Sequence, residues 1–285
     1  MSDFPKVHTA TGKFMVLPQD HVHAYVVELE NEVVVIDGTL ALESARQLRE
    51  LAESFGKPIA ALLLTHGHPD HYVGLTEFAD VPRYASQGAL DFAHEEDRVK
   101  SPVAKGYLGD DYPDERVFPD QIIEDGFVLT VDGVDFTFTH VGPAESPSDG
   151  MWSFDEDGVR HAFIGDTVAD HCHCFFRDGH AEEWLQALER LGRELPDSAK
   201  LYIGHGPTPT TKDAIAWQRG YIQTFLDAVD AAEPKAEPVE RDVQERIIAS
   251  MQGYLPGAAT LFLLDYELDV SIPAYWKKRG FSVAS

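Results

Sequence analysis

The sequence predicts an α/β (α+β) fold built on two sheets. Short runs of β-branched and aromatic residues alternate along the chain with amphipathic stretches that have helical spacing. Strand, helix and strand follow one another near the N-terminus, which predicts a sheet covered by a helix, and paired apolar runs further along predict a second sheet. With 285 residues, 44% of them hydrophobic, the chain can bury a full core as one large domain or as one domain with an appendage.

The first predicted sheet begins with three apolar runs and a hairpin. The turn of the hairpin is Glu30-Asn31, and the runs are 13–17, 24–29 and 32–37. Apolar residues at helical spacing predict a helix over 40–55, which ends at the helix stop Gly56-Lys57-Pro58. The apolar run 59–64 follows as a buried strand.

The middle and the C-terminal part of the chain differ in pattern. The segment from Ser86 to Asp120 is charged and irregular, so we expect an extended loop there that flanks a pocket. The second sheet is predicted from two hairpins, one turning at Asp132-Gly133 and one across 155–158. Beyond them, three amphipathic helices are expected over 181–191, 213–232 and 239–254.

Charge and cysteine content narrow the classes of partner. Lys and Arg number 23 against 49 Asp and Glu, and the net charge of −26 repels nucleic-acid backbones and anionic membranes. No run approaches the roughly 18 apolar residues of a membrane span, and the N-terminal residues do not resemble a signal peptide. Cys172 and Cys174 form no disulfide framework, so we expect reduced thiols in a cytoplasmic protein. The oligomeric state stays open.

One short segment carries most of the chemistry. His66, His68, Asp70 and His71 lie within six residues of one another, directly after the buried strand predicted at 59–64. These positions spread around a helical wheel, but on a tight loop leaving a strand they can converge. Imidazole and carboxylate at this density are what divalent metals such as zinc require. The alternative is a histidine-rich surface turn.

This signature, H-x-H-x-D-H at 66–71, resembles the metallo-β-lactamase superfamily of metal-dependent hydrolases. The later elements come in matching order, with a third-ligand loop, a bridging-aspartate strand end and a last-ligand loop at 142–149, 163–166 and 202–206. The resemblance covers about residues 10–210. It implies a four-layer αββα sandwich with the site at one rim of the two sheets.

The resemblance also implies domain limits and a pair of divalent metals. Residues 1–211 would form the αββα domain, and residues 212–285 a C-terminal helical extension packed on it. The ligands of the first metal would include His66 and His68, and those of the second would be Asp70, His71 and His205, with Asp166 between the two. A hydroxide that bridges the metals would be the nucleophile, oriented by Asp70 as the catalytic residue. We expect zinc, with manganese or iron as alternatives.

Glu145 departs from the superfamily pattern. Most members have a histidine in this loop, and the nearest histidine here is His140 on the preceding strand. We expect Glu145 to bind the first metal, in a harder donor set that also suits manganese or iron. The alternative is that Glu145 points to solvent and leaves the first site weak or empty. A glutamate here resembles the alkylsulfatase branch, whose large additional domains this chain cannot contain.

Four further histidines are predicted to contact the substrate. They are His21, His23, His171 and His173. In an extended segment, the histidines of 171–174 face one way and the cysteines the other, which disfavours a separate metal site there. The alternative for His21 and His23 is a polar surface role.

Two other groups of residues are expected to support the site. We expect Asp37 to hold the histidine loop through hydrogen bonds rather than to bind metal. The aromatic residues Trp217, Tyr221 and Phe225 recur at helical spacing and either pack in the core or line the pocket.

These features predict hydrolysis of an ester, thioester, lactone or amide bond in a small-molecule substrate. Two alternatives within enzymes follow from Glu145: sulfate or phosphate ester hydrolysis, and iron-dependent oxidoreductase chemistry on the same fold. A binding module that has lost its metals is a third.

Overall fold

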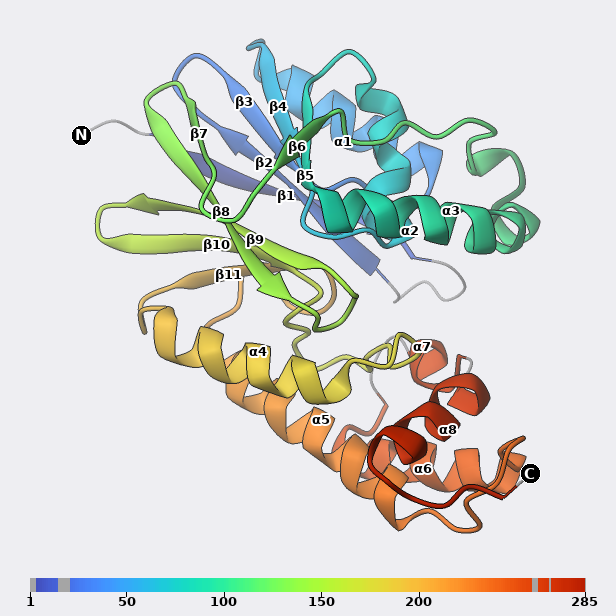
Figure 1. Ribbon diagram of the computed structural model, residues 1–285. Helices are drawn as coiled ribbons and strands as arrows, with labels where there is room; N and C mark the ends of the chain where they lie inside the picture. Colours follow the sequence, from blue (N-terminus) through green and yellow to red (C-terminus); the bar gives the residue numbers. More distant parts are fainter. Residues whose placement is uncertain (1–3, 15–20, 258–260, 267, 285) are drawn as a thin grey trace.

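Two stacked sheets with helices on both outer faces make up the main body of the protein (Figure 1). The computed structural model describes residues 4–14, 21–257, 261–266 and 268–284. The order of layers is helix, sheet, sheet, helix, which confirms the predicted αββα sandwich. Within the described residues, no helix is long and apolar enough to cross a membrane.

The first sheet has six strands in the order β1-β2-β3-β4-β5-β6. The strands are β1 (Lys6–Lys13), β2 (His21–Glu28), β3 (Val33–Ile36), β4 (Ile59–Leu63), β5 (Arg83–Ser86) and β6 (Gln121–Ile123). Strands β1 to β3 are antiparallel neighbours, whereas β3 to β6 run parallel. The carboxyl ends of β3 and β4 therefore meet at one edge of this sheet.

The second sheet has five strands in the order β11-β10-β9-β8-β7. The strands are β7 (Val128–Val131), β8 (Val134–Gly142), β9 (Asp149–Glu156), β10 (Val159–Gly165) and β11 (Lys200–Ile203). The hairpins predicted at Asp132-Gly133 and 155–158 are confirmed. Strand β11 pairs with β10 in parallel, so the carboxyl ends of these two strands also meet at one edge.

Helices cover both outer faces of the sandwich, with α1 and α3 on the first sheet and α4 and α5 on the second (Figure 1). The helices are α1 (Leu42–Ser54), α2 (Pro69–Tyr72), α3 (Gln87–Leu108), α4 (Ala181–Glu194), α5 (Asp213–Ala231), α6 (Arg241–Tyr254), α7 (Leu261–Asp265) and α8 (Leu268–Lys278), with 3₁₀ turns η1 (Val73–Phe78) and η2 (Gly109–Asp111). Four of these, α1, α4, α5 and α6, match helices predicted from the sequence.

The alternation of side chains along β3 explains why both faces of the first sheet are apolar. Val33 and Val35 pack outward against α1 and α3, while Val34 and Ile36 face the second sheet. Between the sheets, large aromatic residues such as Trp152 fill the space, and its indole Nε1 donates to the Leu64 carbonyl at 3.0 Å. This bond ties β9 to the end of β4, where the histidine loop begins.

The prediction of an extended loop from Ser86 to Asp120 is wrong. Most of this segment is the 22-residue helix α3, which begins with the Ser86 hydroxyl accepting from the Ala89 amide. The buried face of α3 carries small or polar residues, namely Ala89, Ala93, Glu96, Ser101 and Ala104. Because such a face gives little apolar periodicity, the helix could not be predicted from the sequence pattern. The segment does flank a cavity, as expected.

The first strand also differs from the prediction at 13–17. Strand β1 ends at Lys13, Phe14 follows it outside the strand, and 15–17 lie outside the described residues. Strand β1 was missed because it is an edge strand with mostly polar, half-exposed side chains.

The C-terminal helices share a core with the second sheet. Residues of α5, α6 and α8 belong to the same apolar cluster as α4 and the outer face of β10 and β11. Trp276 is fully buried there, and its Nε1 donates to the Val229 carbonyl at 2.7 Å. The domain boundary at residue 211 stays a prediction.

Truncating a core side chain of α1 tests the packing of the first sheet. We expect Leu48→Ala to lower the free energy of unfolding by about 2–5 kcal/mol, because Leu48 is fully buried between α1 and the sheet. Urea denaturation measures the change, and Glu50→Ala on the exposed side of the same helix is the control. Equal stability of both variants would contradict this packing.

Candidate metal centre

The predicted metal ligands gather at one rim of the sandwich. The histidine loop leaves the carboxyl end of β4, Asp166 follows β10, and His205 follows β11. Glu145 lies in the loop between β8 and β9. Because the parallel strands of both sheets end at this rim, side chains far apart in sequence meet there, and all seven are buried.

The seven side chains form two adjacent clusters. The first cluster comprises His66, His68 and Glu145, and the second comprises Asp70, His71, Asp166 and His205. Within each cluster, one potential ligand atom from every residue lies within 4.8 Å of the others. The convergence predicted from the H-x-H-x-D-H signature is confirmed, and the alternative of a surface turn is wrong.

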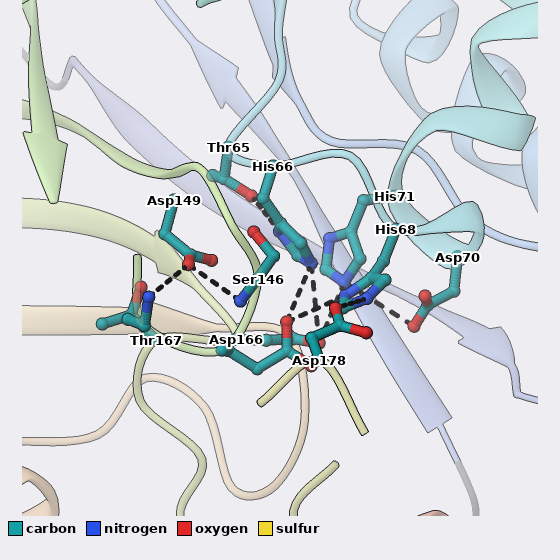
Figure 2. A network of polar contacts seen from close by, with 12 residues as sticks. Thr65, His66, His68, Asp70, His71, Ser146, Asp149, Asp166, Thr167 and Asp178 are labelled. Carbon is teal, nitrogen blue, oxygen red and sulfur yellow. Dashed lines mark hydrogen bonds and ion pairs between the residues drawn. The ribbon is translucent and has the colours of Figure 1, made fainter. Parts of the chain in front are cut away.

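Nitrogen and oxygen donors face one another across short distances. In the second cluster, His205 Nε2 lies 3.1 Å from Asp70 Oδ2 and 3.2 Å from Asp166 Oδ2. In the first, His68 Nδ1 lies 2.8 Å from Glu145 Oε2. His66 Nε2 lies between the clusters, 3.7 Å from Glu145 Oε2 and 3.9 Å from Asp166 Oδ2. Figure 2 shows the rings of His66, His68 and His71 converging on the carboxylates.

Asp37 fixes the loop that carries the histidines. Its Oδ1 accepts from the Thr65 amide at 2.7 Å, and its Oδ2 accepts from the Thr65 hydroxyl at 2.7 Å and from His71 Nδ1 at 3.0 Å. The Thr65 hydroxyl is also 3.0 Å from His66 Nδ1. Two imidazoles are thereby oriented with Nε2 toward the cluster, and the supporting role predicted for Asp37 is confirmed.

The other two imidazoles are oriented from different elements. His205 Nδ1 donates to the His21 carbonyl at 2.7 Å. His68 Nε2 donates to Asp178 Oδ2 at 3.0 Å, which leaves Nδ1 facing Glu145. Asp178 was missed by the sequence analysis, because it follows β10 without any motif of its own. Only the folded chain brings it beside His68 (Figure 2).

Several buried atoms of the two clusters lack a hydrogen-bond partner among the described residues. They are His66 Nε2, His71 Nε2 and Asp166 Oδ1. Buried polar atoms are almost always paired, so these atoms require another partner. All of them are of the types that bind zinc, manganese or iron. The donor set therefore fits a pair of divalent cations, one at each cluster.

Burial and charge set the protonation of the cation-free site. Burial opposes ionisation of Asp70, but His71 and His205 prevail and hold the Asp70 pKa at about 2. Burial raises the pKa of Glu145 to about 7. Burial lowers the pKa of His66 well below its usual value. For His71 and His205, burial is outweighed by Asp166 and Asp70, which raise the pKa of both imidazoles.

The loop that presents Glu145 is held by a buried carboxylate. Asp149 Oδ2 accepts from the amides of Ala144 and Ser146 at 3.2 and 2.9 Å, one on each side of Glu145. Figure 2 shows the Asp149 carboxylate facing Ser146. Glu145 itself is buried and faces His68. The alternative that Glu145 points to solvent is therefore wrong.

Gly204 allows β11 to approach the second cluster. A Cβ atom at this position would overlap Asp166 Oδ1 and lie 2.8 Å from His71 Cε1. No other residue leaves room there for the Asp166 carboxylate and the His71 ring.

The four histidines predicted to contact substrate are placed differently from one another. His23 Nε2 is 3.0 Å from the Gly206 carbonyl, and burial lowers its pKa to about 4. His21 contributes its carbonyl to His205, while its own side chain is exposed. His173 is buried against the Tyr221 hydroxyl at 2.8 Å, whereas His171 is exposed and stacks on Trp217. Their contact with substrate stays a prediction.

A cavity of about 440 Å³ opens over the two clusters. Its floor includes His68, Asp70, Glu145, Asp166 and His205. Residues of α3 line one wall, and the segment Phe262–Tyr266, which was not singled out in the sequence, lines another. Tyr221 and Phe225 pack in the core instead, which was one of the two predicted alternatives.

Paired clusters of this kind at the rim of an αββα sandwich define a class of metal-binding proteins. The chain belongs to the metallo-beta-lactamase superfamily, whose sequence profile matches residues 17–206. Among curated proteins, it is 41% identical over 58 residues to YobT, an uncharacterized protein of Bacillus subtilis (strain 168). That match covers 20% of this chain and 24% of YobT, so the chain spans about a quarter of that relative.

Solved structures share the fold at low sequence identity. A beta-lactamase domain protein from Burkholderia ambifaria has a TM-score of 0.66 and 16% identity, covering 98% of this chain and 89% of that one. A metallo-beta-lactamase family protein from Thermus thermophilus has a TM-score of 0.66 and 20% identity, covering 96% and 94%. A metallo-beta-lactamase from Pontibacter korlensis has a TM-score of 0.62 and 17% identity, covering 78% and 96%.

Removing Asp178 should weaken one cluster selectively. Without the Asp178 carboxylate, the His68 ring loses the bond that holds Nδ1 toward Glu145. We expect Asp178→Ala to lower zinc affinity at the first cluster by about 10–100-fold and to leave the second unchanged. Competition with a chelating dye measures both affinities, with the exposed Asp227→Ala as control. An unchanged first affinity would contradict the role of Asp178.

Metal loading should release protons. The raised pKa values of His68, His71 and His205 keep these imidazoles protonated near neutral pH in the cation-free protein. A cation must displace those protons, so zinc affinity should rise as pH increases through the raised pKa values and fall toward acid. Calorimetric titration in two buffers of different ionisation heat measures the release. Identical heats in both buffers would argue against it.

Proposed function

We propose that the protein is a metal-dependent hydrolase that cleaves an ester, thioester, lactone or amide bond in a small molecule. The proposal rests on one observation, the two adjacent nitrogen and oxygen clusters on the floor of a single cavity. Its volume of about 440 Å³ lies in the range of about 300–1,000 Å³ that is usual for small-molecule sites.

The chain's own residues define what each cluster would hold. His66, His68 and Glu145 would bind one cation, and Asp70, His71, Asp166 and His205 the other. When bound, the two cations supply a Lewis acid for a carbonyl oxygen and an acidified water. Zinc suits these donors, and the oxygen of Glu145 makes the first cluster compatible with manganese or iron.

Asp70 is the residue best placed to handle a proton in the cavity. Its carboxylate lies on the cavity floor, and His205 Nε2 holds Oδ2 at 3.1 Å. With a pKa of about 2, Asp70 is ionised at neutral pH and accepts hydrogen bonds. It would orient an attacking water, take up a proton from that water as it adds to the carbonyl carbon, and then pass the same proton to the leaving atom. Burial of the floor limits the access of bulk water to this exchange.

Glu145 is the reason for considering two other functions. Its carboxylate in the first cluster makes the site more anionic than one with a third imidazole, which favours harder metals. Sulfate or phosphate ester hydrolysis and iron-dependent oxidoreductase chemistry are the alternatives on the same fold. Turnover of alkyl sulfates or aryl phosphates without cleavage of carboxyl esters would favour the first, and a coloured iron-containing sample the second.

The cytoplasmic location stays a prediction.

Metal analysis of Glu145→Ala tests the proposal. We expect wild type to purify with close to two metal equivalents, and Glu145→Ala to lose metal because the first cluster keeps only its two imidazoles. Elemental analysis gives the occupancy, and a panel of nitrophenyl esters gives the activity, which should fall with it.

The matched control is Glu124→Ala, which removes an exposed glutamate that is not among the residues lining the cavity. It should match wild type in both measurements. Equal occupancy in wild type and Glu145→Ala would remove Glu145 from the ligand set. Full occupancy without hydrolysis of any ester, thioester, lactone or amide would overturn the proposed reaction.

A further inference from the structure

Two aromatic walls lead from the metal clusters to α7. On one side, the Phe14 ring lies 4.8 Å from the His205 ring and 5.5 Å from the Phe262 ring. On the other side, the Phe175 ring lies 5.5 Å from His68 and 6.1 Å from Tyr266. Each wall starts at a histidine of the floor and ends at the C-terminal helices. The space between the walls is therefore bordered mainly by aromatic rings.

The charged groups of these walls are already paired. Beyond the clusters, the described charged residues that line the cavity are Lys100 and Asp265. Lys100 Nζ pairs with Glu96 and lies 4.7 Å from the centre of the Phe175 ring. Asp265 receives two bonds from Arg241, at 2.6 and 3.0 Å. A charged substrate group in this space would have to compete with the present partner of Lys100 or of Asp265.

Helix α3 adds exposed apolar side chains at the mouth of the cavity. Val103 and Tyr107 line the cavity, four residues apart on one side of the helix, and are 44% and 67% exposed. Leu263 of α7 lines the same cavity. An exposed apolar surface beside a cavity marks a place where an apolar group binds.

We propose that this space binds an uncharged apolar chain of the substrate, so that the enzyme prefers long acyl chains over short ones. The reacting group would lie at the floor beside Asp70, and the chain would extend between the aromatic walls toward Val103 and Leu263. The inference rests on the proposed hydrolase function for the reaction, but the binding of the chain depends on the walls alone.

Chain length sets the expected size of the effect. Each methylene removed from water contributes about 0.8 kcal/mol, which corresponds to about fourfold in affinity. Affinity should rise by up to about this factor for each added methylene until the chain leaves the cavity. A charged chain end should reduce the gain, because the charged side chains that the structure describes in these walls already have partners.

The binding arm of the test uses uncharged probes without turnover. The binding of butanol, hexanol and octanol to the full-length protein is measured by calorimetry, with and without chelator. We expect affinity to rise with length in both conditions. Val103→Gln should lower octanol affinity about fourfold, equivalent to one lost methylene. Val99→Gln is the matched control, because Val99 lies one turn away on α3, is 46% exposed and is not among the lining residues. Leu263→Gln should also weaken octanol binding.

The hydrolysis arm measures kcat/KM for nitrophenyl acetate, butyrate, hexanoate and octanoate. We expect the ratio of octanoate to acetate to be high in wild type and in Val99→Gln, and to fall about fourfold in Val103→Gln. The inference would be overturned, even if esters are cleaved, by alkanol affinity that does not change with chain length. An equal effect of Val103→Gln and Val99→Gln on octanol affinity would also overturn it. Length-dependent binding without cleavage of any ester would support the apolar site and refute the proposed reaction.

Discussion

The concentration of seven ionisable side chains in a buried rim is the constraint on which the rest of the structure depends. Leaving carboxylates such as Asp70 and Asp166 ionised out of water costs several kcal/mol unless opposite charge lies close by. Four imidazoles face them at distances down to 2.8 Å, and yet His66 Nε2 and Asp166 Oδ1 have no hydrogen-bond partner within the described part of the chain. The protein alone leaves this arrangement incomplete, whereas a pair of cations would satisfy both the charge and the open donor atoms.

That arrangement is held by bonds to the far side of each ring. Asp37 orients His71, and Asp178 orients His68, while His205 is held by a backbone carbonyl of β2. The supports come from the end of β3, from the segment after β10 and from the start of β2. Substitutions outside a cluster can therefore weaken it. If a supporting bond is lost, the imidazole ring can rotate and its ligand nitrogen no longer points toward the cluster, although every ligand residue is still present.

How far the sequence predicts this protein depends on whether the signal is local. The H-x-H-x-D-H segment could be recognised because its donors lie within one loop. Strands β3 and β4 could be predicted because they are continuous apolar runs, and α1 because its apolar residues recur at helical spacing. Helix α3 escaped because its buried face carries alanines, Ser101 and Glu96. The roles of Asp178 and α7 were not predicted for another reason. They arise only from contacts with residues distant in sequence, which no pattern in a single sequence records.

The floor and the walls of the cavity come from different parts of the fold. The floor is built from strand ends of the sandwich, whose positions are fixed by two sheets and their helices. The walls come from α3 and from Phe262–Tyr266, which lie outside the sheets. We expect substitutions in α3 or in Phe262–Tyr266 to change the size and polarity of the space without moving Asp70 or Glu145, and changes at the floor to affect metal binding as well. Selectivity for substrate can therefore vary on this framework while the donor geometry, set by the rim, stays the same.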